Sequence, residues 1–358
     1  MQAVLMGEAA RIGWLSLRRK LSGWKRYPGN VQSICDAILN DCWNGRFYQA
    51  SAGHFRQFYA RDIGIAAPFL DKERLRATMS YALERYAAHG KITTSITPGN
   101  DGAPFDFPVF GVDSLPFLLR GLRCANDKRI VSDHKEFLKI EIERWEAIVL
   151  NNDGFVKRNV HFSSMRDHAI RSSSCYDNAM VLLLKQEANA LGLRTNVKLT
   201  AAKFIKEFWN GRFLNDERDK EVLGGDANVV PWWLGVVDDK KKAKTCLQAL
   251  HELRMDLPIP LSYSESSTVA PKMIGHEFFV PSWERDGRWM QLGLMYVDVA
   301  TKLKMPWADE VIASVRSNIE RNQNVLEVFT PEGRPYTSAF YHADESMLWG
   351  AALAKKAF

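Results

Sequence analysis

The sequence predicts an all-α fold in which six helical hairpins close into a ring, an (α/α)6 toroid with short β-hairpins in its loops. Two observations predict it: the period of the apolar residues and the alternation of two kinds of helical segment. The period is helical along most of the chain. Leu75, Met79, Leu83 and Tyr86, for example, follow one face of a helix.

The helical segments alternate between apolar and amphipathic ones. Residues 178–184, 229–237 and 346–354 are apolar on nearly every side, whereas 71–89 and 133–150 carry a heavily charged face. An all-apolar helix is buried all round, and an amphipathic helix is buried on one side only. The alternation therefore predicts an inner ring of helices wrapped by an outer ring. An irregular helical bundle is the alternative.

The helix over 72–89 has the clearest ends, because Asp71 is suited to cap its first turn and Gly90 to end its last. The twelve expected helices span residues 33–45, 57–69, 72–89, 113–124, 133–150, 174–191, 198–208, 229–237, 241–253, 291–304, 307–321 and 343–356. Strands are expected at 155–160, 277–280 and 325–329, with a hairpin that reaches residue 336. No Pro/Ser-rich linker or block of charge divides the chain, so residues 1–358 are expected to form a single (α/α)6 domain.

The composition excludes several classes of protein. The 358 residues, 46% of them hydrophobic, are enough to bury a large core. No stretch reaches the ~18–20 consecutive apolar residues of a membrane span. The five cysteines form no CxxC pair and residues 1–20 lack a signal-peptide pattern, so we expect a cytoplasmic protein with reduced cysteines. The net charge of +6 is scattered, so neither nucleic acid nor a membrane is an expected partner.

Aromatic residues suggest a ligand class where cofactor motifs do not. The sequence contains no HExxH, GxxxxGK[ST] or GxGxxG motif, so no metal, nucleotide or other cofactor is expected. It contains eleven Trp. Trp rings stack on the apolar faces of sugars while neighbouring carboxylates bind the hydroxyls, so a small carbohydrate is the expected partner. The sequence does not specify an oligomeric state.

Polar and aromatic residues recur where the chain enters each inner helix. In a ring of hairpins these entries gather at one end of a central funnel, so residues far apart in sequence would meet there. Asp, Ser or Asn before an apolar helix is also an ordinary N-cap, which explains any single case but not the Arg, Tyr and Trp beside it. The expected substrate-binding residues are Tyr59, Arg61, Asp62, Tyr176, Asp177, Asp226, Asn228, Trp283, Glu284, Asp286, Trp289, Tyr341 and His342.

Short segments of the chain resemble neutral/alkaline invertases and glycogen-debranching glucosidases, which are six-hairpin glycosidases. Phe58–Asp62 resembles their aromatic-x-Arg-Asp helix start. Gly111–Ser114 resembles the segment that holds their general acid. Leu326–Phe329, followed by Gly333–Tyr336, resembles the segment that holds their general base.

The resemblance implies Asp113 as general acid and Glu327 as general base. Glycoside hydrolysis needs one carboxylic acid to protonate the leaving oxygen and one carboxylate to activate water. The residue chemistry alone would allow the two roles to be exchanged, since apolar neighbours of Glu327 would raise its pKa. Arg61 and Asp62 would clamp sugar hydroxyls, with a buried structural salt bridge as the alternative.

The sequence therefore predicts an inverting glycoside hydrolase for a small α-linked glucoside or a sucrose-like sugar. Two alternatives remain open. A sugar epimerase or isomerase on the same toroid would need two facing histidines, for which His276 and His342 are the suitable positions. A non-catalytic carbohydrate-binding protein would bind sugar without turnover.

Overall fold

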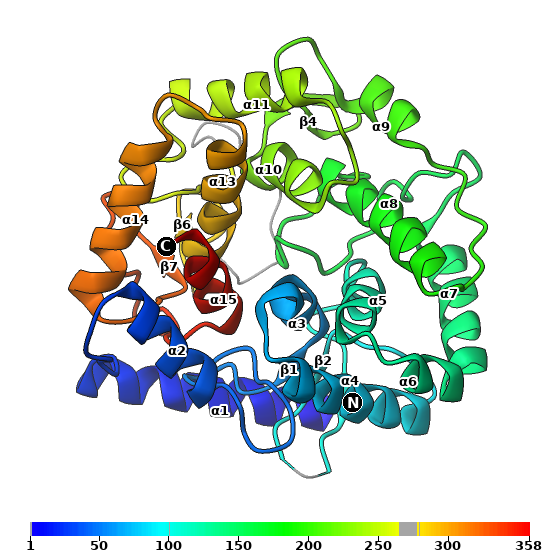
Figure 1. Ribbon diagram of the computed structural model, residues 1–358, viewed down its shortest axis with the longest axis horizontal. Coiled ribbons are helices and arrows are strands. Elements are labelled where there is room, and N and C mark those ends of the chain that lie inside the picture. Colours follow the sequence, from blue (N-terminus) through cyan, green and yellow to red (C-terminus); the bar gives the residue numbers. More distant parts are fainter. Residues whose placement is uncertain (1, 100, 265–277, 279) are drawn as a thin grey trace.

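The protein is a closed ring of helices (Figure 1). The computed structural model describes residues 2–99, 101–264, 278 and 280–358, and the chain is mostly helical (52%). The inner helices are α3 (Ala60–Ala66), α5 (Ser114–Ala125), α8 (Cys175–Ala190), α10 (Gly225–Leu234), α13 (Met290–Lys302) and α15 (Leu348–Ala357). Each contacts the next, and α15 contacts α3, which closes the ring. The predicted (α/α)6 toroid is confirmed.

An outer ring of amphipathic helices surrounds the inner one. The outer helices are α2 (Val31–Asp41), α4 (Lys72–His89), α7 (Lys135–Val149), α9 (Ala201–Phe208), α11 (Lys240–Glu252) and α14 (Ala308–Asn322). Each of them contacts an inner helix. All twelve predicted helices are thus present, and the predicted helix over 57–69 is shortened to α3 followed by the 3₁₀ turn η1 (Ala67–Phe69).

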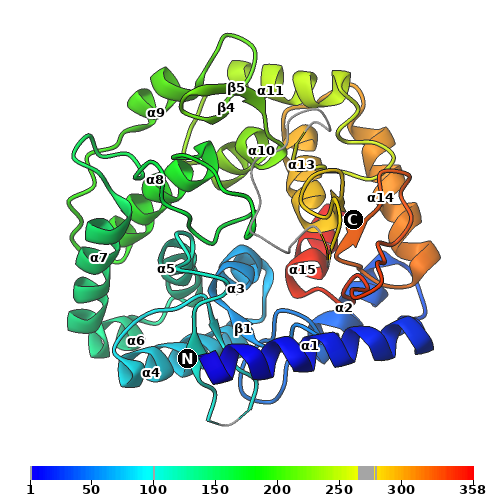
Figure 2. The same cartoon turned by 180° about the vertical axis from the view of Figure 1, so that it is seen from behind.

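In the part of the chain that the structure describes, two further helices were not predicted, α1 (Gln2–Ser22) and the short α6 (Lys128–Asp133). Both views show α1 along the edge of the toroid that α2 and α4 occupy (Figures 1 and 2). Glu8 and Arg11 interrupt the apolar run of α1, and their side chains attach the helix to the segment around residues 54–57. They pair with each other at 2.7 Å, Glu8 accepts from Gln57, and Arg11 donates to the His54 carbonyl. Neither α1, with 21 residues, nor any other described helix is long and apolar enough to cross a bilayer.

Besides α3, two inner helices begin several residues away from their predicted starts, because contacts distant in sequence set their first residues. The α10 helix begins at Gly225 rather than 229, and the side chain of Asn228 pins its first turn to the backbone N–H and C=O of Leu214 at 2.7 and 2.8 Å. The α15 helix begins at Leu348 rather than 343, because the Met347 amide bonds to the Val325 carbonyl. Neither contact can be read from a local period.

The strands are short and lie in the loops. They form three antiparallel groups: β1 (Phe58–Tyr59) with β2 (Ser95–Ile96) and β3 (Pro104–Phe105), β4 (Asn215–Glu217) with β5 (Lys220–Leu223), and β6 (Arg288–Trp289) with β7 (Val328–Phe329).

Among the expected strands, the one over 325–329 is observed as β7. The expectation at 155–160 is wrong, since a single bridge from Val156 to Leu150 replaces a strand. In the segment 277–280, residues 277 and 279 lie outside the described residues, and residues 278 and 280 are not in a strand.

Close approach of inner helices requires glycine at their contacts. Gly64 of α3 lies against the backbone of α5, where a Cβ would come within 2.3 Å of the Phe117 carbonyl oxygen. Gly13 on the exposed side of α1 is the opposite case, since a Cβ there would meet no atom within 4 Å. The inner ring is therefore packed by backbone contact, and the outer surface is not.

We expect Gly64→Ala to lower the free energy of unfolding by about 1–3 kcal/mol, because the added methyl group must push α3 away from α5. The matched change Gly13→Ala should leave it unchanged or raise it by about 0.5–1 kcal/mol, since alanine favours helix where there is room. Urea unfolding of both variants measures this. Equal stability of the two would contradict the close packing of the inner ring.

Candidate active site

An open cavity, with about 650 Å³ of empty space when its solvent-filled mouth is included, lies where the inner helices begin. Arg61 and Asp62 reach it from α3, Gln291 from α13 and Trp349 from α15. The full set of lining residues is Ala50, Phe55, Tyr59, Arg61, Asp62, Phe107, Met165, Asp167, His168, Tyr263, Trp283, Glu284, Trp289, Gln291, Glu327, Met347 and Trp349. The funnel expected from the sequence therefore lies at the end of the ring where the N-termini of the inner helices gather.

Arg61 is the centre of a carboxylate cluster on one side of the cavity. Its guanidinium lies 3.9 Å from Asp62 and 3.4 Å from both Asp113 and Asp167, and it donates to the Ser164 carbonyl. Burial raises the pKa of Asp62 to about 7 despite Arg61. Asp62 and Asp167 line the cavity, whereas Asp113 does not.

Asp113 sits behind this cluster, with its side chain 3% exposed. Tyr176 donates to it at 2.8 Å, and Arg61 binds the same oxygen. Burial raises the pKa of Asp113. Asp177 is buried next to Tyr176, and burial raises its pKa to about 6. Neither Tyr176 nor Asp177 is among the lining residues.

Asp167 is the carboxylate that the sequence analysis did not single out. Its side chain is 23% exposed, more than Asp62 at 10%. Ser163 donates to one of its oxygens at 2.5 Å and Arg61 binds the other. It lies on a loop without a hydrophobic period. The sequence signal was limited to the two Arg, the Asp and the His that lie within residues 166–171.

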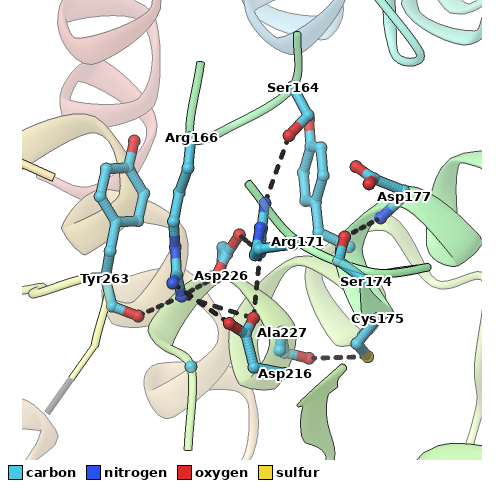
Figure 3. Close-up of polar contacts among 12 residues, drawn as sticks. Ser164, Arg166, Arg171, Ser174, Cys175, Asp177, Asp216, Asp226, Ala227 and Tyr263 are labelled. Atoms are coloured by element: carbon cyan, nitrogen blue, oxygen red, sulfur yellow. Dashed lines mark hydrogen bonds and ion pairs between the residues drawn. The ribbon is translucent and has the colours of Figure 1, made fainter. Parts of the chain in front are cut away.

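A buried ion cluster holds that loop in place (Figure 3). Arg166 and Arg171 each contact both Asp216 and Asp226, at 2.7 to 3.2 Å in the closest pairs, and all four side chains are at most 4% exposed. Arg171 also donates to Ser164. Burial by itself would raise the pKa of Asp226, but the two guanidinium groups outweigh burial and lower it. The expected sugar ligand Asp226 is thus bound within the protein, away from the cavity lining, as is Asn228.

Glu327 also lines the cavity. The β6–β7 pair brings it beside Trp289, and the Met290 amide donates to the Glu327 carbonyl at 3.1 Å. Tyr341 donates to its Oε2 at 2.5 Å, and the Asp344 amide donates to the same oxygen at 3.2 Å. Burial, with the charge of Asp344 as a second cause, raises the pKa of Glu327 to about 8.

Aromatic rings form one wall of the cavity. Trp283 and Trp289 have ring centroids 4.9 Å apart, and Tyr263 lies 5.0 Å from Trp289. Tyr341 packs 5.2 Å from Trp283 from behind. Glu284 lines the cavity and accepts from the His168 amide at 3.1 Å.

The last expected ligands lie outside the lining. Asp286 is next to Arg285, with which it pairs at 3.5 Å. The His342 ring stacks on Trp24 at 4.3 Å, and burial lowers its pKa to about 4. His276, the other histidine of the epimerase alternative, lies outside the described residues. Of the expected ligands, the cavity therefore brings together Tyr59, Arg61, Asp62, Trp283, Glu284 and Trp289, and Glu327 with them.

Among the described residues, no group of three or more His, Cys, Asp or Glu side chains is arranged to hold a metal ion. The carboxylates of the cavity are bound by Arg61, Ser163, Tyr341 and backbone amides instead.

Comparison of the chain with protein-family models finds no match, and comparison with curated proteins finds none. Solved structures do match. A rhamnosidase from Klebsiella oxytoca superposes with a TM-score of 0.63 at 12% identity, over 92% of this chain and 65% of its own. A GH63 mannosylglycerate hydrolase from Thermus thermophilus has a TM-score of 0.61 at 12% identity, over 91% of this chain and 99% of its own. A glucoamylase from Hormoconis resinae has a TM-score of 0.60 at 10% identity, over 91% and 72%. The fold is that of the six-hairpin glycosidases.

Asp167 and Glu327 reach the cavity from segments that are far apart in the chain. Asp167 precedes α8, the third inner helix, and Glu327 lies in the segment that leads to α15, the sixth. Both carboxyl groups line the same cavity.

We expect Asp226→Asn to lower the free energy of unfolding by about 3–5 kcal/mol, because it leaves two buried guanidinium groups with one carboxylate. The exposed Asp309→Asn on α14 removes an equal charge and should cost no more than about 1 kcal/mol. Urea unfolding at neutral pH compares the two. If Asp226→Asn lowers the free energy of unfolding only slightly, the charges of Arg166 and Arg171 are stabilised by water rather than by Asp226.

Proposed function

We propose that this protein is an inverting glycoside hydrolase that acts on a small α-linked glucoside or a sucrose-like sugar. The observation that carries the proposal is the cavity that Asp167 and Glu327 both line and that Trp283 and Trp289 wall. Inversion requires an acid on one side of the sugar and a base with its water on the other. Similar folds hold rhamnose and glucose, which supports a six-membered sugar ring as ligand.

Glu327 is the proposed general base. Both of its described hydrogen bonds go to Oε2, so Oε1 is the oxygen available to take a proton from water. The neighbouring Trp289 and Trp349 line the same cavity and limit access of bulk water. A carboxylate in such a site abstracts a proton more readily than one in water, because burial raises its pKa.

Asp167 is the proposed general acid, the role that the family resemblance assigned to Asp113. The acid must touch the leaving oxygen, and Asp167 lines the cavity whereas Asp113 does not. Asp113 is proposed to hold Arg61, which in turn holds Asp167. Both assignments predict loss of activity on mutation, but they differ in how the loss depends on the leaving group.

Arg61 and Asp62 are proposed to orient the sugar. The Asp62 carboxyl faces the cavity, and its pKa of about 7 lets it accept or donate a hydrogen bond to a hydroxyl. Arg61 is bound to three carboxylates, so its main contribution is to fix the positions of Asp62 and Asp167. Loss of Arg61 should therefore impair binding and rate together.

A cytoplasmic location is part of the proposal. All five cysteines are buried and free, which supports a reducing compartment. A small carbohydrate is the proposed partner.

Glu327→Gln should lower kcat by at least about 10²-fold on every substrate, because proton abstraction from water is lost. Added azide should restore turnover by attacking the sugar in place of water. Sugar release from an α-glucoside panel measures both, and NMR of the fresh product should show the inverted anomer. A retained anomer would contradict inversion.

Asp167→Asn should lower kcat by at least about 10²-fold on natural disaccharides, since the leaving alkoxide needs a proton. The loss should be much smaller on aryl glucosides, whose leaving groups depart without one. Asp113→Asn should instead lose a similar factor on both substrates, because it acts through Arg61. If Asp113→Asn shows the leaving-group dependence and Asp167→Asn does not, the acid is Asp113.

Trp289→Ala should weaken sugar binding by about 10-fold or more, because a stacking platform of the cavity is lost. Quenching of Trp fluorescence during a glucose titration measures the affinity. Trp307→Ala, outside the cavity lining at the start of α14, where Trp307 stacks on His251 at 4.0 Å, is the matched control. Equal affinities in the two variants would reassign Trp289 to packing.

A further inference from the structure

We propose that Tyr341 and His54 form a proton relay behind Glu327, and the proposal rests on the role of Glu327 as general base. The Tyr341 hydroxyl lies 2.5 Å from Glu327 Oε2 and 3.2 Å from His54 Nε2. His54 Nδ1 lies 3.2 Å from Asp344 Oδ1. Four side chains thus form one line, from the cavity wall to the interior of the ring.

The inner members of this line are closed to water. His54 is 0% exposed and Asp344 is 1% exposed. The Tyr341 hydroxyl has a single hydrogen, so it can donate to Glu327 or to His54 but not to both. The protonation of Glu327 and the state of the His54 ring are therefore linked by geometry.

Two arrangements of the protons satisfy the line. When Glu327 is protonated, it donates to Tyr341, Tyr341 donates to Nε2, and the His54 ring is neutral with its hydrogen on Nδ1 towards Asp344. When Glu327 is ionised, Tyr341 donates to Glu327 and Nε2–H donates to Tyr341. A neutral ring would then turn the lone pair of Nδ1 towards the Asp344 carboxylate, which repels it, so the ionised base favours an imidazolium.

The step between the two arrangements conserves protons and charge. The proton of Glu327 moves to the Tyr341 oxygen, and the proton of Tyr341 moves to His54 Nε2. The products are a carboxylate, an unchanged phenol and an imidazolium that faces Asp344 at an ion-pair distance without hydrogen-bond alignment. No proton leaves the protein, so Glu327 can become a base without contact with bulk water.

Charged and titratable groups on every neighbouring element act on the relay. Burial lowers the pKa of His54 and Asp344 raises it, while Arg11 and Arg19 of α1 lower it. Because of burial the ring is neutral at rest, and the carboxylate formed at Glu327 supplies the charge that stabilises its protonated form. The other groups that face the line are Asp62, Tyr59 and His342, with Cys42 and Glu345 beside Asp344.

The relay predicts that Glu327 works as a base at a pH below its own pKa of about 8. Tyr341→Phe removes one oxygen and breaks the line. We expect the acidic limb of kcat/KM to move up by at least about one pH unit, which is a loss of about tenfold at pH 6 that recovers at about pH 9. Tyr86→Phe, which removes a buried hydroxyl bonded to the Thr93 carbonyl far from the cavity, is the matched control. A loss that is equal at every pH would reduce Tyr341 to a packing role.

A second measurement does not require activity. ¹⁵N NMR of the eight histidines, with His54 assigned through His54→Asn, reports the tautomer and charge of its ring. In the wild type the His54 signals should change as Glu327 titrates, whereas in Glu327→Gln the ring should remain neutral with its hydrogen on Nδ1 across the same range. If the pH dependence of the His54 signals is the same in Glu327→Gln as in the wild type, the relay is overturned, even if the enzyme is active. A coupled signal in a protein that hydrolyses no glycoside would leave the relay standing and overturn the proposed function.

Discussion

The closure of the inner ring depends on one buried carboxylate. Asp344, just before the last inner helix, accepts hydrogen bonds from the Ser51 hydroxyl and from the amides of His54 and Phe55, which lead to the first. The two ends of the ring of six inner helices meet at this group. Without it, the segments that lead into α15 and α3 would lose the polar contacts that fix their register, and the cavity would lack the wall between Glu327 and Tyr59.

Buried ion pairs also position the loop that carries Asp167. Arg166 and Arg171 hold the loop of Asp167 against the start of α10 through Asp216 and Asp226. Burying four charges is costly unless each is paired, so the loop has few alternative positions. Side chains on helices are generally held in more precise positions than side chains on loops. The ion cluster gives the Asp167 loop a comparably fixed position.

The two sides of the cavity differ in how their carboxyl groups are stabilised. Around Arg61, three carboxylates share one guanidinium, and the one with the most exposed side chain is Asp167. Glu327 is held by a phenol and an amide rather than by a guanidinium, so burial dominates its pKa. The two carboxyl groups thus have different electrostatic environments: a guanidinium faces the proposed acid, and burial dominates at the proposed base.

The sequence by itself determined the toroid, because the alternation of all-apolar and amphipathic helices places six apolar segments inside a layer of half-exposed ones. It also indicated Arg61, Asp62, Trp289 and Glu327, whose short motifs or places before inner helices can be read along the chain. Only the tertiary structure decided that Asp167 rather than Asp113 lines the cavity, and that Asp226 belongs to an ion cluster. The physical reason is that the exposure and the charge partners of a side chain near the start of a helix depend on loops from other hairpins. The periodic pattern of neighbouring residues carries no information about those loops.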